Sequence, residues 1–138
     1  MSFFLASADG ACGRILVVED DSDTAFFIVH VLTKLGPFDV THTRDPAAAL
    51  DLLRTGIWDL VITDLELPGM SGADMAGILR RDSPGLPVVI LTAQVHLIPG
   101  LTGAADEVLA KPVPAITLVE IARSLISGHR GTSAAAQR

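Results

Sequence analysis

The chain has 138 residues, a length that suits one globular domain with a single hydrophobic core. Hydrophobic residues make up 49% of it and charged residues 19%, with a formal net charge of −6, so the composition excludes a disordered tail and argues against direct binding to nucleic acid. The single cysteine cannot form an internal disulfide and no apolar stretch reaches the ~20 residues of a membrane span, so we expect a cytoplasmic protein without membrane contact.

Short β-branched runs alternate with helix-like segments from residue 14 onward. The predicted strands lie at residues 15–18, 38–42, 60–63, 87–91 and 107–110. The predicted helices lie at residues 22–35, 46–54, 72–81 and 114–126, with a short irregular helix at 96–101. This alternation predicts a doubly wound α/β fold, in which a five-stranded parallel sheet has helices on both faces.

Residues that favour helix ends mark several of these boundaries. Asp21 suits the N-terminus of the first predicted helix, and Gly36 suits a left-handed residue just after it. Asp45 and Pro46 suit the N-cap and the first position of the second helix, and Pro114 suits the first position of the last helix.

Polar side chains follow four of the predicted strands directly. In chain order they are Glu19 and Asp20 after "ILVV", Asp64 after "VIT", Thr92 after "VVIL" and Lys111 after "EVLA". Ligands of an open parallel sheet bind outside the carboxyl ends of its strands, so these side chains are expected to converge on one pocket. Three acids at close range repel one another unless a cation is present, and their hard oxygens suit Mg²⁺. A carboxylate in such a site can act as a nucleophile and form an aspartyl phosphate.

The stretches "ILVVED", "DLVITDLELPGMSG", "VVILTA" and "VLAKPV", in this order, resemble the receiver domain of bacterial two-component response regulators. The resemblance covers residues 14–126 and implies a flavodoxin-like fold with strand order 2-1-3-4-5. By position it implies that Asp64 is the phosphoacceptor, that Asp20 is a direct Mg²⁺ ligand and that Glu19 helps to hold the ion through water.

The resemblance implies roles for five more groups. The backbone carbonyl of Glu66 would be a further Mg²⁺ ligand, Thr92 the switch hydroxyl and Lys111 the phosphate-binding lysine. The bond between Lys111 and Pro112 would be cis, a plausible state for a bond to proline. The side chains of Glu66 and Gln94, two residues after the phosphoacceptor and the switch threonine, would influence hydrolysis of the acyl phosphate.

The implied function is a phosphorylation-dependent signalling switch. A histidine kinase or a histidine phosphotransfer protein would phosphorylate Asp64, and the phosphorylated domain would act on a downstream protein target. Such a protein is not an enzyme beyond catalysing its own phosphoryl transfer and slow autodephosphorylation. The alternatives are a pseudo-receiver that docks without phosphorylation, and a small hydrolase in which Glu66 stands where a second catalytic aspartate is usual.

Two departures from the family pattern affect the expected output. Val108 stands where the family usually has a Tyr or Phe whose ring moves with the switch hydroxyl. The segment between Thr92 and Lys111 is about three residues shorter than usual and contains Pro99 and Gly100, which disfavour a regular helix. The usual output and dimer face is therefore expected to be remodelled.

The first predicted helix is apolar on two sides, although a helix that covers a sheet needs only one apolar stripe. We expect the sheet to be covered by the first stripe: Thr24, Phe27, Ile28, Val31 and Leu35. We expect the second stripe to dock the kinase or phosphotransfer protein: Ala25, Phe26, Val29 and Leu32. A homodimer contact, or cover by the N-terminal "SFFLA", is the alternative.

The remaining expectations concern the chain ends and the histidines. Residues 1–13 and 127–138 are rich in Ser, Gly and Ala and are expected to be loosely ordered. The histidines show no ligand spacing and are expected to have surface or structural roles: His30, His42, His96 and His129.

Overall fold

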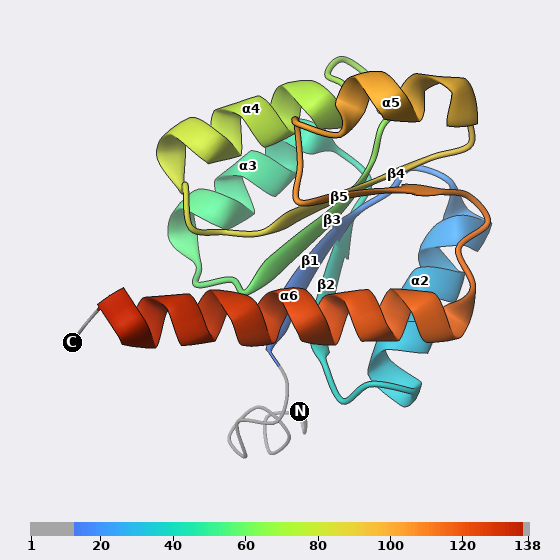
Figure 1. Ribbon diagram of the computed structural model, residues 1–138. Helices are drawn as coiled ribbons and strands as arrows, with labels where there is room; N and C mark the ends of the chain where they lie inside the picture. Colours follow the sequence, from blue (N-terminus) through green and yellow to red (C-terminus); the bar gives the residue numbers. More distant parts are fainter. Residues whose placement is uncertain (1–12, 137–138) are drawn as a thin grey trace.

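The chain forms a five-stranded parallel sheet between two layers of helices (Figure 1), seen in a computed structural model that describes residues 13–136, with side chains for 13–128. The strands are β1 (Arg14–Val18), β2 (Asp39–Thr43), β3 (Leu60–Asp64), β4 (Val88–Thr92) and β5 (Glu107–Ala110). Their order across the sheet is β2-β1-β3-β4-β5, and every neighbouring pair is parallel. The predicted fold class and strand order are confirmed.

Helices cover both faces of the sheet (Figure 1). On one face lie α2 (Ser22–Lys34) and α6 (Ala115–Ala136), and on the other lie α3 (Pro46–Thr55) and α4 (Gly72–Asp82). Between β4 and β5 the chain forms a 3₁₀ turn, η1 (Val95–Leu97), and the one-turn helix α5 (Ile98–Leu101). The predicted short, irregular helix is confirmed.

The last helix differs most from its predicted length. It begins at Ala115, so Pro114 precedes the helix instead of occupying its first position, and it continues past the predicted end at Ile126 to Ala136. Residues 127–136, predicted to be loosely ordered, are therefore helical. Residues 1–12 and 137–138 lie outside the described residues, and the domain limits 14–126 stay a prediction.

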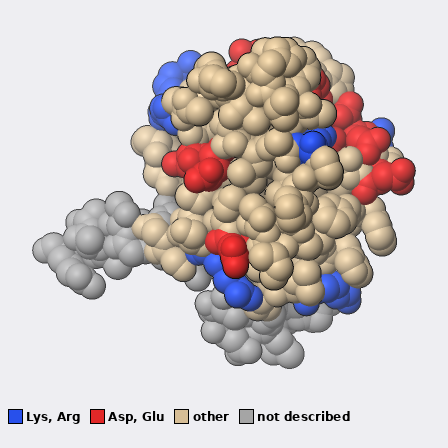
Figure 2. Space-filling model, turned by 45° about the vertical axis from the view of Figure 1, so that its right-hand side comes forward, with Lys and Arg blue, Asp and Glu red and all other residues tan. Residues whose placement is uncertain are grey.

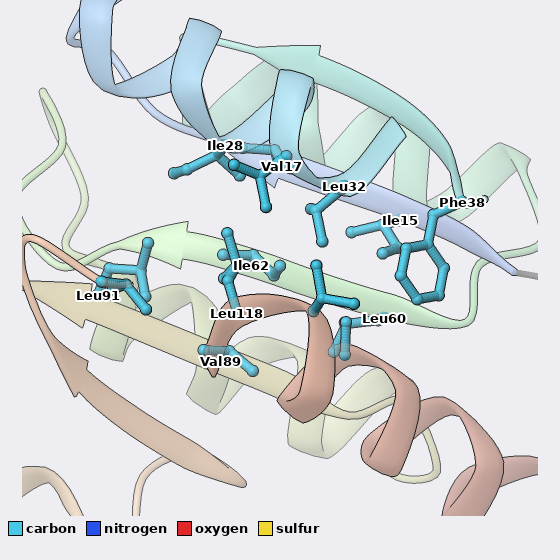
Figure 3. Packing of buried hydrophobic residues seen from close by; sticks show 14 of the residues in the cluster. Ile15, Val17, Ile28, Leu32, Phe38, Leu60, Ile62, Val89, Leu91 and Leu118 are labelled. Carbon is cyan, nitrogen blue, oxygen red and sulfur yellow. The ribbon is translucent and has the colours of Figure 1, made fainter. Parts of the chain in front are cut away.

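The core consists of two apolar layers, because successive residues of a strand point to opposite faces of the sheet. Ile15 and Val17 of β1 pack toward α2 and α6, whereas Leu16 and Val18 pack toward α3 and α4. Figure 3 shows the first layer, in which Leu118 of α6 joins residues of the sheet and α2. Burial on both faces explains why β1, β3 and β4 read as unbroken apolar runs.

Helix caps account for the helix starts that the sequence predicts. Asp21 accepts a hydrogen bond from the backbone nitrogen of Thr24 at 2.9 Å, and Asp45 does the same for Ala48 at 3.2 Å. The prediction for Gly36 is wrong, because within residues 13–136 a positive φ occurs only at Gly13 and Gly69. A Cβ at Gly36 would lie 2.5 Å from the ring of Phe38, so close packing and not backbone conformation favours glycine there.

The predicted exposed stripe on α2 is wrong in two of its members. Ala25 and Leu32 are buried against the sheet together with Ile28, whereas Phe26 is 72% exposed. Residues separated by three and four positions share one side of a helix, so positions 25, 28 and 32 form the face that meets the sheet. Phe27, predicted to face the sheet, is 42% exposed as a result.

The surface within the described residues shows no single dominant charge in the view of Figure 2, where acidic and basic side chains are scattered among uncharged ones. None of the helices in residues 13–136 combines the length and apolarity needed to cross a membrane.

The start of α4 lies so close to the end of β3 that only glycine fits there. A Cβ at Gly72 would lie 2.3 Å from the backbone oxygen of Asp64. We expect Gly72→Ala to lower the free energy of unfolding by about 1–3 kcal/mol, because the backbone must shift to accept the methyl group. The measurement is urea unfolding followed by circular dichroism.

Gly77→Ala is the matched control, because Gly77 is an exposed residue of the same helix with open space around its Cα. This variant is expected to be stabilised by about 0.5–1 kcal/mol, the usual gain from alanine in a helix. Equal stability of the two variants would contradict the close approach at Gly72.

Candidate functional site

The carboxyl ends of the strands bring the predicted site residues together. Asp64 is the last residue of β3 and Thr92 the last of β4, while Glu19 follows β1 directly and Lys111 follows β5. In the sheet, Asp64 is paired with Leu91, one residue before Thr92. The backbone nitrogen of Lys111 donates to the carbonyl of Thr92 at 2.8 Å, which fixes the start of the lysine side chain against β4.

The lysine ammonium group joins two buried carboxylates. Lys111 Nζ lies 3.0 Å from Glu19 Oε1 and 3.0 Å from Asp64 Oδ1. Glu19 is 1% exposed and Asp64 5%. The second oxygen of Glu19 accepts a hydrogen bond from the backbone nitrogen of Asp21 at 3.2 Å. Buried charges are costly unless they are paired, so this lysine stabilises both acids.

The charge balance of the site alters the pKa values of two groups. Burial raises the pKa of Asp64 to about 6, although Lys111 opposes the change, and the negative charge of Glu19 adds to it. Burial lowers the pKa of Lys111, but its contacts with Asp64 and Glu19 outweigh this and raise the pKa overall. The positive charge of Lys111 therefore does not fully neutralise the negative charge of the acids in the site.

The donor set fits a hard divalent cation. Glu19, Asp20 and Asp64 each offer one carboxylate oxygen, and these oxygens lie within 4.8 Å of one another. Oxygen ligands of this kind, with room left for water, are what Mg²⁺ prefers in proteins. The acidic cluster that the sequence predicts is thus present and could hold a metal ion.

Thr92 contacts the two residues that were expected to influence hydrolysis. Its hydroxyl oxygen accepts a hydrogen bond from the backbone nitrogen of Gln94 at 2.9 Å and lies 3.5 Å from Glu66 Oε2. The side-chain nitrogen of Gln94 donates to the same oxygen of Glu66. The bond between Lys111 and Pro112 is cis, the state that the resemblance implies.

Sequence reasoning missed one contact with the site. His42 Nε2 lies 2.8 Å from the carbonyl oxygen of Glu19. His42 is the register partner of Val17, two residues before Glu19, so the parallel pairing of β1 and β2 brings it there. The strand assignment alone could have suggested this contact, but a histidine without ligand spacing gave no other signal.

Comparison with known proteins identifies close relatives. Residues 15–123 match the family model described as response regulator receiver domain. DNA-binding response regulator MtrA of Mycobacterium tuberculosis is 42% identical over 114 residues, which cover 80% of this chain and 49% of MtrA. Transcriptional regulatory protein CusR of Escherichia coli is 34% identical over 116 residues, which cover 82% of this chain and 51% of CusR. This chain thus spans about half the length of these relatives.

A solved structure of high similarity is response regulator protein TrrA of Thermotoga maritima, crystallised in complex with Mg²⁺-BeF. Its TM-score to this chain is 0.75 with 33% sequence identity, and the match covers 81% of this chain and 97% of that one.

The expectation that nucleic acid is not a direct partner is wrong. It is contradicted by relatives that are named as a DNA-binding response regulator and as transcriptional regulatory proteins. The expectation came from the net charge of −6, which describes the 138 residues of this chain alone. The match covers only about half of each relative, so the charge of this chain says nothing about what the other half of a relative contacts.

The raised pKa of Asp64 gives a stability prediction for the metal-free protein. Its pKa of about 6 lies above the ordinary 3.8, so the folded state binds this proton more tightly than the unfolded chain does. The contribution of Asp64 to stability is therefore favourable below pH ~4 and is lost as the pH rises through 6. We expect Asp64→Asn to be more stable than the wild type by about 1–2 kcal/mol at pH 7.5 with a chelator present.

The measurement is thermal or urea unfolding at several pH values. The gain of the variant should shrink as the pH falls and be absent near pH 4, where the wild-type carboxyl is protonated as well. A variant that is no more stable than the wild type at pH 7.5 would contradict the electrostatic cost assigned to Asp64.

Proposed function

This chain belongs to the response regulator receiver domain family, and on that basis we propose that it is switched by phosphorylation of Asp64. The observation that carries the proposal is the environment of this carboxylate. It stands at the end of a buried strand, 5% exposed, with Lys111 Nζ at 3.0 Å from Oδ1. Such a group is positioned to attack a phosphoryl group whose charge the lysine partly neutralises.

In the proposed reaction, a carboxylate oxygen of Asp64 attacks the phosphorus atom of a phosphohistidine on a histidine kinase or histidine phosphotransfer protein. The new P–O bond forms as the P–N bond breaks, and the electron pair of the broken bond stays on the imidazole nitrogen, which takes a proton from solvent. Lys111 stays beside the acceptor oxygen during the transfer. Later attack by water on the acyl phosphate restores the carboxylate and releases inorganic phosphate.

Mg²⁺ is the proposed cofactor of this transfer. Glu19, Asp20 and Asp64 would hold it, together with the backbone carbonyl of Glu66, and the oxygen-only donor set supports this choice. The ion would supply charge neutralisation on the transferring phosphoryl group. Glu66 and Gln94 would adjust the rate of hydrolysis, and the cytoplasm is the proposed location.

A docking module that is never phosphorylated is a second candidate. The observation that favours it is Val108, partly buried beside the α3 and α4 layer, where the family usually has an aromatic ring. Phosphorylation of the purified protein separates the two candidates.

We expect wild-type protein incubated with Mg²⁺ and acetyl phosphate to gain one phosphoryl group, detected by intact mass spectrometry. Asp64→Asn should gain none, because the amide cannot attack phosphorus, and Asp20→Ala should gain it much more slowly and should bind Mg²⁺ weakly. Asp51→Asn is the matched control, since Asp51 has a 78% exposed side chain on α3 and should leave labelling unchanged. Labelling of Asp64→Asn at the wild-type rate would refute the acceptor assignment.

The phosphoryl donor is proposed to dock beside the exposed part of α2. A groove of about 480 Å³ runs between α2 and the segment after β5, lined by Phe27, Ile28, Pro112 and Val113, and it reaches Lys111. A donor must bring its phosphohistidine to this end of the sheet, so the groove borders its path. The neighbouring Phe26 is 72% exposed and stacks on His30 at a ring separation of 5.8 Å.

We expect Phe26→Ser combined with Val29→Ser to slow transfer from a phosphorylated protein donor several-fold and to leave labelling by acetyl phosphate unchanged. Ile57→Ser is the control, because Ile57 is 82% exposed at the opposite end of the sheet. A lower melting temperature of the double variant with unchanged donor kinetics would show instead that these side chains pack within the protein.

A further inference from the structure

Glu66, Thr92 and Gln94 form a closed ring of contacts beside the acceptor site. The side chain of Gln94 donates to Glu66 Oε2, and the backbone nitrogen of Gln94 donates to Thr92 Oγ1 at 2.9 Å. Thr92 Oγ1 lies 3.5 Å from that same Glu66 oxygen, which is the outer limit of a hydrogen bond. The ring joins the connection after β3 to the start of η1, for which Gln94 is the N-cap residue.

The hydroxyl group of Thr92 has only one proton to donate within this ring. A threonine hydroxyl donates a single hydrogen bond, and Thr92 Oγ1 already accepts one from Gln94. Within the described residues, the hydroxyl of Thr92 has Glu66 Oε2 as its acceptor, at 3.5 Å. If Thr92 is to donate to a phosphoryl oxygen on Asp64, it must give up Glu66. The carboxylate of Glu66 and the phosphoryl group therefore compete for one proton.

Electrostatic repulsion between the Glu66 carboxylate and a phosphoryl group on Asp64 also favours breaking the contact between Glu66 and Thr92. Glu66 already raises the pKa of Asp64 through charge repulsion. A phosphoryl group adds about −1.5 to −2 charges at neutral pH, so it repels the Glu66 carboxylate more strongly than Asp64 does. Both Glu66 and Gln94 are exposed, and a solvent-exposed hydrogen bond is weak enough to open under such a force.

We propose that Glu66 and Gln94 form a latch that holds Thr92, η1 and α5 in the unphosphorylated arrangement and opens when Asp64 is phosphorylated. The proposal rests on the proposed function, because the phosphoryl group is the competitor that opens the latch. It also provides an output route where Val108 offers no aromatic ring. The movement of Thr92 reaches the surface through the Gln94 side chain and the exposed segment that follows it: Val95, His96 and Leu97.

The latch can be tested first without phosphate or metal. Hydrogen exchange of the wild type, Gln94→Ala and His96→Ala is compared in the presence of a chelator. Amides of residues 95–101 should exchange several-fold faster in Gln94→Ala, because the tie to Glu66 is lost, while amides of β1 and β3 stay protected. His96→Ala is the control, since it lies in the same exposed segment outside the ring. Unchanged exchange in Gln94→Ala would overturn the latch.

The second test is binding of beryllium fluoride with Mg²⁺, a phosphoryl analogue found bound to the related TrrA. Gln94→Ala should bind it several-fold more tightly than the wild type, because the latch no longer opposes the bound arrangement. Glu66→Gln removes the charge and keeps an acceptor oxygen, so it measures the charge effect by itself. Tighter binding in Glu66→Gln with no change in Gln94→Ala would mean that charge alone acts, and the latch would be refuted.

The two tests separate failure of the latch from failure of the proposed function. A wild-type protein that binds no beryllium fluoride with Mg²⁺ would contradict Asp64 as the phosphoacceptor. The hydrogen-exchange comparison would still decide whether Glu66 and Gln94 hold η1 and α5 in place, because it uses the protein without any phosphoryl group.

Discussion

The ion contact of one ammonium group with two carboxylates is the interaction on which this site depends. Glu19 and Asp64 are almost fully buried, and each has Lys111 Nζ at 3.0 Å. Their burial without a cation would cost several kcal/mol. Lys111 can reach both because the sheet order places β1 beside β3, and because its own backbone is hydrogen-bonded to the end of β4. The topology of the sheet and the chemistry of the site are therefore inseparable.

The same interaction leaves the negative charge of the site incompletely neutralised. One lysine faces Glu19, Asp64 and the nearby Asp20, and the pKa of Asp64 is raised to about 6. A divalent cation would relieve the excess negative charge. The acidic cluster thus destabilises the protein without a cation and favours binding of one. Binding sites commonly lower the stability of a protein in this way.

The side of the domain between β4 and β5 is where this chain differs from the family pattern. Where the resemblance implies a regular helix and an aromatic residue, the chain has a short 3₁₀ turn, a one-turn helix and Val108, and Gln94 is hydrogen-bonded to Glu66. Glu66 and Gln94 are 28 residues apart in the sequence and meet through this hydrogen bond. A signal that begins at Asp64 would therefore leave the domain by a route built from polar contacts instead of a rotating ring.

The sequence by itself determined the fold class, the strand order through family resemblance, and the positions of the acids, Thr92 and Lys111 at strand ends. Local rules suffice for these, because apolar runs define buried strands and a residue after a strand must lie at the rim of the sheet. Tertiary structure decided which side of α2 is buried, why Gly36 is glycine, and that the Gln94 side chain is hydrogen-bonded to Glu66. A helix with two apolar sides could turn either side toward the sheet, and only packing against the sheet selects one of them. A hydrogen bond between two loops likewise depends on distances in space that no local sequence pattern encodes.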